Sequence, residues 1–171
     1  MTPTSAAAPR VVWFYGLAGL IPFAAGALGG FSDNEVVLIV SRLGLAIYAG
    51  LILSFLGGAR WGLEIGRASV RPAVIGLAMV PTLLAFGLLA WPHLPSRFQF
   101  LGLAAGFALQ WLWDLRADGA PSWYPRLRTV LSVGALAALI AGAVAAGFEG
   151  DGPGSAHGSH TVAAKASTKA V

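Results

Sequence analysis

Apolar residues fall into five long runs separated by short polar stretches, and this alternation dominates the chain. The runs cover residues 11–30, 36–59, 73–90, 98–113 and 129–148. A transmembrane helix needs about 20 predominantly apolar residues to cross the roughly 30 Å hydrocarbon core of a bilayer. The fourth run is somewhat short for this, but its exit is marked by two tryptophans, which favour the membrane interface. The pattern predicts an all-α fold: a polytopic transmembrane helix bundle with five membrane-spanning helices.

The two ends of the chain lack this pattern. Residues 1–10 are rich in Ala, Thr, Ser and Pro and predict a disordered lead, and residues 149–171 are rich in Gly, Ser, Ala and His and predict a disordered tail. Residues 11–148 form the predicted transmembrane domain. The first run also has the three regions of a cleavable signal peptide, which is the alternative interpretation. Its early aromatics favour a retained span, because aromatic side chains anchor helices at the interface.

Composition supports lipid as the surrounding medium. Hydrophobic residues make up 57% of the chain and charged residues only 11%, whereas soluble domains carry about 25% charged residues. The mean hydropathy is +0.74. The chain has no cysteine, which excludes disulfides, thiol nucleophiles and cysteine-ligated metals.

Arginines are distributed unequally between the two sides that five spans would create. The amino-terminal side has seven close to the membrane: Arg10, Arg60, Arg67, Arg71, Arg116, Arg126 and Arg128. The opposite side has only Arg42 and Arg97. Cytoplasmic loops carry an excess of basic residues, so we expect a cytoplasmic amino terminus and an extracytoplasmic carboxyl terminus in a bacterial inner (plasma) membrane. Arg42, near the start of its span, is expected to extend to the headgroups along its own stem.

The most informative stretch is residues 54–64, which reads SFLGGARWGLE and ends the second run. If the helix continues beyond the membrane, Arg60, Glu64, Arg67 and Arg71 share one face. One interpretation is a solvated helix end on which Glu64 pairs with Arg60 and Arg67. In the alternative, Arg60 turns into the bundle and pairs with Asp114 at the end of the fourth run, because an unpaired cation at membrane depth is costly. Trp61 lies in the same stretch.

A second polar and aromatic group precedes the last run. Trp123 and Tyr124 are followed by Arg126 and Arg128, which is typical of a headgroup anchor and indicates contact with anionic lipid or with a partner protein. Gln110, deep in the fourth run, is expected to hydrogen-bond to a neighbouring helix.

Small residues recur at four-residue spacing, which permits close helix packing in membranes. The pairs are Gly26/Gly30, Gly58/Gly62, Gly62/Gly66 and Gly102/Gly106, and the last run has a stripe of Gly134, Ala138, Gly142 and Ala146. The stripe is expected to be a packing face, either within the chain or against a second copy.

No catalytic constellation is visible. The chain has no phosphate-binding glycine loop, no HExxH motif and no histidine placed beside a serine within a span. We therefore predict that the protein is not an enzyme and has no cofactor or metal.

Four segments resemble a known family. They are Gly19-Leu20-Ile21-Pro22-Phe23, residues 54–62, Val80-Pro81, and Asp114 followed by Trp123-Tyr124 and Leu127-Arg128. On these segments, which extend over roughly residues 11–148, the chain resembles domain-of-unknown-function family 3429. The resemblance implies a small multi-span protein of a bacterial or mitochondrial inner membrane, and it implies no activity.

The expected role is that of a non-enzymatic scaffold, assembly factor or accessory subunit with a basic and aromatic cytoplasmic face. Its partners would be the bilayer, anionic lipid headgroups, and a membrane-protein partner or a second copy, but not nucleic acid. The candidate functional cluster comprises Arg60, Trp61, Glu64, Asp114, Trp123, Tyr124 and Arg128. A small transporter or channel, formed by one chain or by an oligomer, is the alternative, and an enzyme acting on lipid is a third interpretation.

Overall fold

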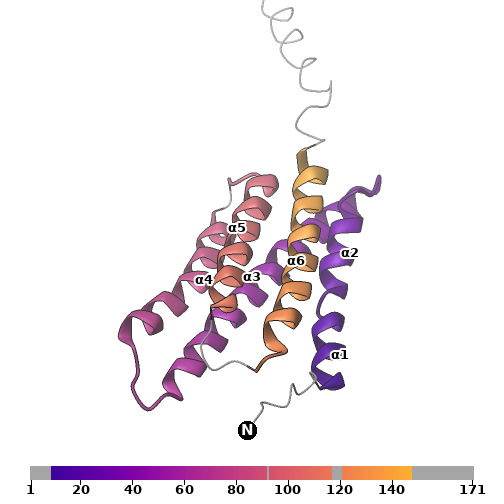
Figure 1. The fold of residues 1–171 in the computed structure, drawn as a ribbon. Helices are drawn as coiled ribbons and strands as arrows, with labels where there is room; N and C mark the ends of the chain where they lie inside the picture. Colours follow the sequence, from indigo (N-terminus) through magenta and orange to yellow (C-terminus); the bar gives the residue numbers. More distant parts are fainter. Residues whose placement is uncertain (1–8, 92, 117–120, 148–171) are drawn as a thin grey trace, which may run out of the picture.

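The computed structural model describes residues 9–91, 93–116 and 121–147, and the regular secondary structure there is entirely helical (Figure 1). The helices are α1 (Arg10–Ala18), α2 (Ile21–Gly29), α3 (Glu35–Ile65), α4 (Pro72–Ala90), α5 (Ser96–Leu115) and α6 (Tyr124–Gly147). The predicted all-α fold is therefore found. Residues 1–8 and 149–171, which make up nearly all of the predicted lead and tail, lie outside the described residues.

Four helical segments are long and apolar enough to cross a membrane: Arg10–Gly29, Glu35–Ile65, Pro72–Ala90 and Tyr124–Gly147. The first of these joins α1 and α2. Helix α5 is not among them, although it has 20 residues, since Arg97, Gln99, Gln110 and Asp114 make it more polar than the others. The protein is thus a multi-pass membrane protein, and the fifth span stays a prediction.

The first predicted span is interrupted rather than continuous. Helix α1 ends at Ala18 and α2 begins at Ile21. Pro22 has no N–H and cannot donate to the carbonyl of Ala18, which weakens the helix at this point. The hydroxyl of Tyr48, on α3, donates to the carbonyl oxygen of Gly19 at 2.9 Å. A side chain from a neighbouring helix thus satisfies a backbone group at the break, as the bilayer requires.

Helices α3 and α6 each extend at least five residues beyond a predicted bound. Helix α3 begins after Asn34, whose side chain accepts hydrogen bonds from the N–H groups of Val36 and Val37 at 3.0 and 3.2 Å. It then continues past Ala59 to Ile65, because no proline interrupts residues 54–64. Helix α6 begins at Tyr124, five residues before the predicted start at Thr129, with Pro125 in its first turn, where a proline is well tolerated.

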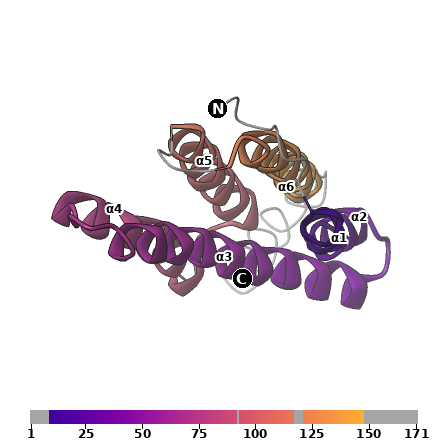
Figure 2. The same ribbon diagram turned by 60° about the horizontal axis from the view of Figure 1, so that its bottom comes forward.

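Helix α3 runs across one side of the bundle and contacts α2, α4, α5 and α6, while α5 and α6 pack against each other (Figure 2). Glycines allow the closest approaches. A Cβ on Gly57 would lie 2.5 Å from the carbonyl oxygen of Ala78 on α4, and a Cβ on Gly26 would lie 2.8 Å from Cβ of Leu45. Close backbone contact of this kind is how helices associate where lipid removes the hydrophobic driving force.

The predicted small-residue stripe on the last span packs within this chain. A Cβ added to Gly134 would meet Leu20, and one added to Gly142 would meet Leu45 and Phe100. In contrast, Gly58 has no described neighbour that would obstruct a Cβ, and neither does Gly62. These two glycines therefore make no close helix contact among the described residues.

Candidate functional site

A carboxylate and two guanidinium groups meet inside one end of the bundle. Asp114, in the last turn of α5, is only 3% exposed. Its Oδ1 lies 3.6 Å from Nε of Arg60 on α3, and its Oδ2 lies 2.5 Å from Nη2 of Arg128 on α6. Three helices that are distant in sequence are thus tied together by one side chain. We call Arg60, Gln110, Asp114 and Arg128 the arginine–aspartate cluster.

Of the two arrangements considered for Arg60, the structure has the one in which it turns into the bundle. Its guanidinium carbon also lies 4.3 Å from the centroid of the Trp113 ring, a cation–π contact that is strongest away from water. The sequence offers this partnership as one of two arrangements, because Arg60 and Asp114 both end apolar runs on the same side.

Gln110 differs from its prediction. The sequence predicts a hydrogen bond to a neighbouring helix, but the Nε2 of Gln110 donates to Oδ1 of Asp114 at 3.2 Å, one turn along the same helix. The i,i+4 spacing places both side chains on one face of α5, and this face is turned inward. Gln110 therefore orients the carboxylate instead of joining two helices.

Among the predicted site residues, Arg128 differs most from its predicted environment. A headgroup anchor would be exposed, whereas Arg128 is 6% exposed and its guanidinium faces Asp114. The reason is the early start of α6, which places Arg128 in the second turn of the helix instead of in a loop. Trp123 and Tyr124 are half-buried, with ring centroids 6.4 Å apart, and their role as an anchor stays a prediction.

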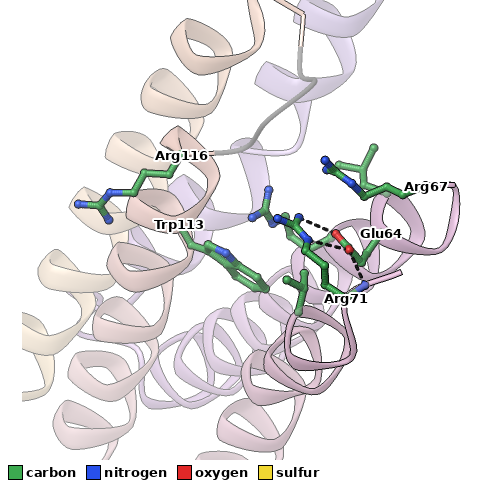
Figure 3. Close-up of a pocket in the computed structure, with 8 residues that line it drawn as sticks. Glu64, Arg67, Arg71, Trp113 and Arg116 are labelled. Atoms are coloured by element: carbon green, nitrogen blue, oxygen red, sulfur yellow. Dashed lines mark hydrogen bonds and ion pairs between the residues drawn. The ribbon is translucent and has the colours of Figure 1, made fainter. Parts of the chain in front are cut away.

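Glu64 has a different partner from the two expected. Its Oε1 accepts hydrogen bonds from the backbone N–H and from Nε of Arg71, both at 2.9 Å, and its Oε2 accepts from Nη2 of the same residue at 2.8 Å (Figure 3). The expected pairing failed because α3 ends at Ile65 and the chain turns back into α4, which carries Arg71 over the carboxylate. The two-pronged contact is the strong form of an arginine–carboxylate pair.

Beside this pair lies a hollow of about 170 Å³ with an excess of positive charge (Figure 3). It is lined by four arginines, one carboxylate and three apolar side chains: Arg60, Leu63, Glu64, Arg67, Arg71, Val74, Trp113 and Arg116. We call it the arginine hollow. Trp61, a predicted site residue, does not line it and is exposed. The arrangement suits an anionic group that approaches from the end of the bundle, because guanidinium groups bind phosphate and carboxylate oxygens well.

The opposite end of the bundle has its own arginine contact. Nη2 of Arg42 donates to the carbonyl oxygen of Ala145 at 3.2 Å, so this side chain joins α3 to the last turn of α6 instead of simply extending to the headgroups. A cation at a helix carboxyl terminus also interacts favourably with the helix dipole. Arg42 therefore helps to close this end of the bundle.

Sequence reasoning missed the burial of Arg128, which it had named as a site residue, and did not select Ser132. Arg128 could have been placed in the bundle had Pro125 been recognised as a first-turn proline that starts α6. Ser132, one turn further along, is 2% exposed and lies among apolar side chains. Nothing in the sequence distinguishes it from an ordinary serine in a membrane helix.

The comparisons with known proteins agree with a membrane protein. The chain is 35% identical to transmembrane protein 69 of Xenopus tropicalis over 140 residues, covering 78% of this chain and 53% of that protein. It is 30% identical to transmembrane protein 69 of Mus musculus over 136 residues, covering 77% and 55%. The chain thus spans about half the length of these relatives. No solved structure matches it. The family model described as "Protein of unknown function (DUF3429)" matches residues 8–144, and the chain belongs to this family.

Proposed function

We propose that the protein is a non-enzymatic component of a bacterial inner membrane. It acts as a scaffold, assembly factor or accessory subunit that offers its arginine-rich end to a partner protein and to anionic headgroups. One observation carries the proposal. The charges buried in the bundle are directed at one another, whereas the arginine hollow opens at the end of the bundle with a surplus of cations. The buried ion pairs hold the helices together, and the hollow presents Arg67 and Arg116 at the end of the bundle.

The proposal includes α5 as a fifth span. Helix α5 packs against α3, α4 and α6, and its polar residues Gln110 and Asp114 are buried, while Leu101, Leu109 and Leu112 are exposed. Two of the four residues that lower the hydropathy of α5 therefore do not face lipid, and the exposed Arg97 lies in its first turn. A polar side chain that faces the bundle interior is compatible with a membrane span.

The orientation in the proposal follows from the arginines. With α5 as a span, the arginine hollow and the arginine–aspartate cluster lie on the amino-terminal side, and the positive-inside bias assigns that side to the cytoplasm. The carboxyl terminus then lies outside the cytoplasm. Both relatives are named transmembrane protein 69, which supports the membrane assignment and implies no activity.

The interior between the two ends argues for a non-transporting role. It is filled by large apolar side chains that are almost completely buried: Phe23, Leu45, Leu53, Phe100, Leu103, Phe107 and Leu139. Transport of a polar solute needs polar groups along its path, and these side chains provide none. Asp114, which is buried, already has two cations as partners, which leaves it a poor general base.

Affinity purification from native membranes, followed by mass spectrometry, tests the proposal. Arg67→Gln and Arg116→Gln remove charge from the arginine hollow, and Arg97→Gln is the matched control because it removes an exposed cation from the opposite end. We expect a membrane-protein partner that is captured by the unaltered chain and by the control but lost from the hollow variants. Recovery of the chain alone, at every abundance in a mild detergent, would refute a scaffold role.

The interrupted first span favours one alternative, a small transporter. Discontinuous helices are a recurrent feature of transporter binding sites, and α1 and α2 break at residues 19–20. An oligomer could then create a path that one chain lacks. Flux of ions or small solutes into proteoliposomes that contain the unaltered chain, absent from protein-free liposomes, would establish this function in place of the scaffold.

A further inference from the structure

A second cavity opens on the side of the bundle, next to the break in the first span. It has a volume of about 190 Å³ and lies between α1 and α2, α3, α5 and α6. Its walls are mainly aromatic and aliphatic, and include Tyr15, Phe23, Phe55, Phe107 and Leu131. We call it the lateral pocket. It is distinct from the arginine hollow, with which it shares no lining residue.

Two polar side chains also line this apolar pocket, and both have unused hydrogen-bonding groups. Arg128 and Ser132 are 6% and 2% exposed. Neither Nε of Arg128 nor Oγ of Ser132 has a hydrogen-bond partner among the described residues. The two residues are one turn apart on α6 and so lie on the same face. Buried polar atoms are satisfied in the great majority of cases, and these two donors therefore point to a ligand with acceptor oxygens.

The charge of the neighbouring cluster favours an anionic ligand. Arg60 and Arg128 share the single carboxylate of Asp114, so the cluster has a net charge of +1 by this count. Their side chains are only 11% and 8% exposed, and water can compensate little of that surplus. An uncompensated buried cation is costly. A negatively charged group at Nε of Arg128 would neutralise the cluster.

We propose that the lateral pocket binds an anionic amphiphile with a single acyl chain, of the long-chain fatty acid class. Its carboxylate would accept hydrogen bonds from Nε of Arg128 and Oγ of Ser132. The start of its chain would lie against Phe23, Phe55 and Phe107, and the remainder would extend into the bilayer.

The size of the pocket favours one chain over a phospholipid. Pockets that enclose a drug-sized molecule usually measure about 300–1,000 Å³. At about 190 Å³, the lateral pocket holds a carboxylate and the first part of one chain, but not a glycerophosphate head with two chains. Phospholipids also carry anionic oxygens, so the experiment must distinguish a bound fatty acid from a bound phospholipid.

Photocrosslinking tests the proposal on the full chain in a mild neutral detergent. The probe is a long-chain fatty acid with a diazirine in its chain, and the competitors are oleate, methyl oleate and dioleoylphosphatidylglycerol. We expect crosslinks to peptides that line the lateral pocket, competition by oleate, and competition by methyl oleate at least tenfold weaker because the ester has no charge. Ser132→Ala should weaken binding about tenfold, the effect of losing one hydrogen bond to a charged group.

Ser54→Ala is the matched control, because the Ser54 hydroxyl pairs with Thr82 at 3.0 Å and does not line the lateral pocket. It should leave binding unchanged. Equal binding by Ser132→Ala and the unaltered chain would overturn the proposal, as would equal competition by the acid and its methyl ester. If Arg67→Gln weakens binding and Ser132→Ala does not, the anion occupies the arginine hollow instead. Stronger competition by the phospholipid than by oleate would overturn the single-chain assignment.

Discussion

Asp114→Asn isolates the contribution of one negative charge to the bundle. The substitution keeps the size of the side chain and one acceptor oxygen but leaves Arg60 and Arg128 without a counter-charge. At an effective dielectric constant near 20, the attraction is about 5 kcal/mol for the pair at 3.6 Å and about 7 kcal/mol for the pair at 2.5 Å. Relaxation and water entry reduce these gross values. Removing one member of a buried pair typically destabilises a protein by about 3–5 kcal/mol.

We therefore expect Asp114→Asn to lower the free energy of unfolding by about 3–5 kcal/mol, and the midpoint of thermal unfolding in mild detergent by roughly 10 °C. Asp33→Asn is the control, because Asp33 is an exposed acid in the turn before α3. A second test is the double variant Asp114→Asn with Arg128→Gln, which removes one of the stranded cations. Its loss of stability should be smaller than the sum of the two single losses by about 1–3 kcal/mol. Losses of less than about 1 kcal/mol for Asp114→Asn, equal to those of the control, would refute the structural role of the cluster.

Three further predictions concern the helix contacts and the orientation. Gly57→Ala should lower the free energy of unfolding by about 1–3 kcal/mol because the added Cβ meets the backbone of α4. Gly58→Ala should be neutral, since its Cβ meets nothing within 4 Å. Equal effects of the two substitutions would contradict the close helix contact. Tyr48→Phe should cost about 1 kcal/mol through the lost hydrogen bond to the break in the first span, and an unchanged unfolding midpoint would argue against that role. The chain has no cysteine, so single Ser69→Cys and His93→Cys variants can be labelled selectively. In intact spheroplasts an impermeant maleimide should label only His93→Cys. Labelling of Ser69→Cys alone would invert the proposed topology.

The sequence was sufficient to predict that the protein is helical and lies in a membrane, because both properties follow from the long apolar runs and the shortage of charged residues. It also offered the pairing of Arg60 with Asp114 as one of two arrangements, since both residues end apolar runs on the same side. The break at residues 19–20 was not predicted, although Pro22 marks the position. A proline at a helix start and a proline within a helix look alike when only the hydrophobic pattern is considered.

The partners of Glu64 and Arg128 could not be predicted, for a common reason. Both depend on where a helix begins or ends, and element boundaries are the least reliable result of sequence reasoning. A start five residues earlier converts Arg128 from an interfacial cation into a buried one. The end of α3 at Ile65 brings Arg71 back over Glu64 and leaves Arg67 at the rim of the hollow. Charge and periodicity therefore did not predict the partners of these two residues, because both partners depend on helix boundaries.

The length of α3 has a consequence for how the protein meets its surroundings. With 31 residues at about 1.5 Å each, its axis measures about 46 Å, against a hydrocarbon layer of roughly 30 Å. Even at a steep tilt of about 40°, the helix would still extend about 35 Å along the membrane normal. At least one end must therefore project into the headgroup region or beyond. Among the described residues, the hairpin between α3 and α4 projects farthest at the lower end in Figure 1, so within this part of the chain it is the segment most accessible to a protease or a soluble protein arriving from the aqueous phase.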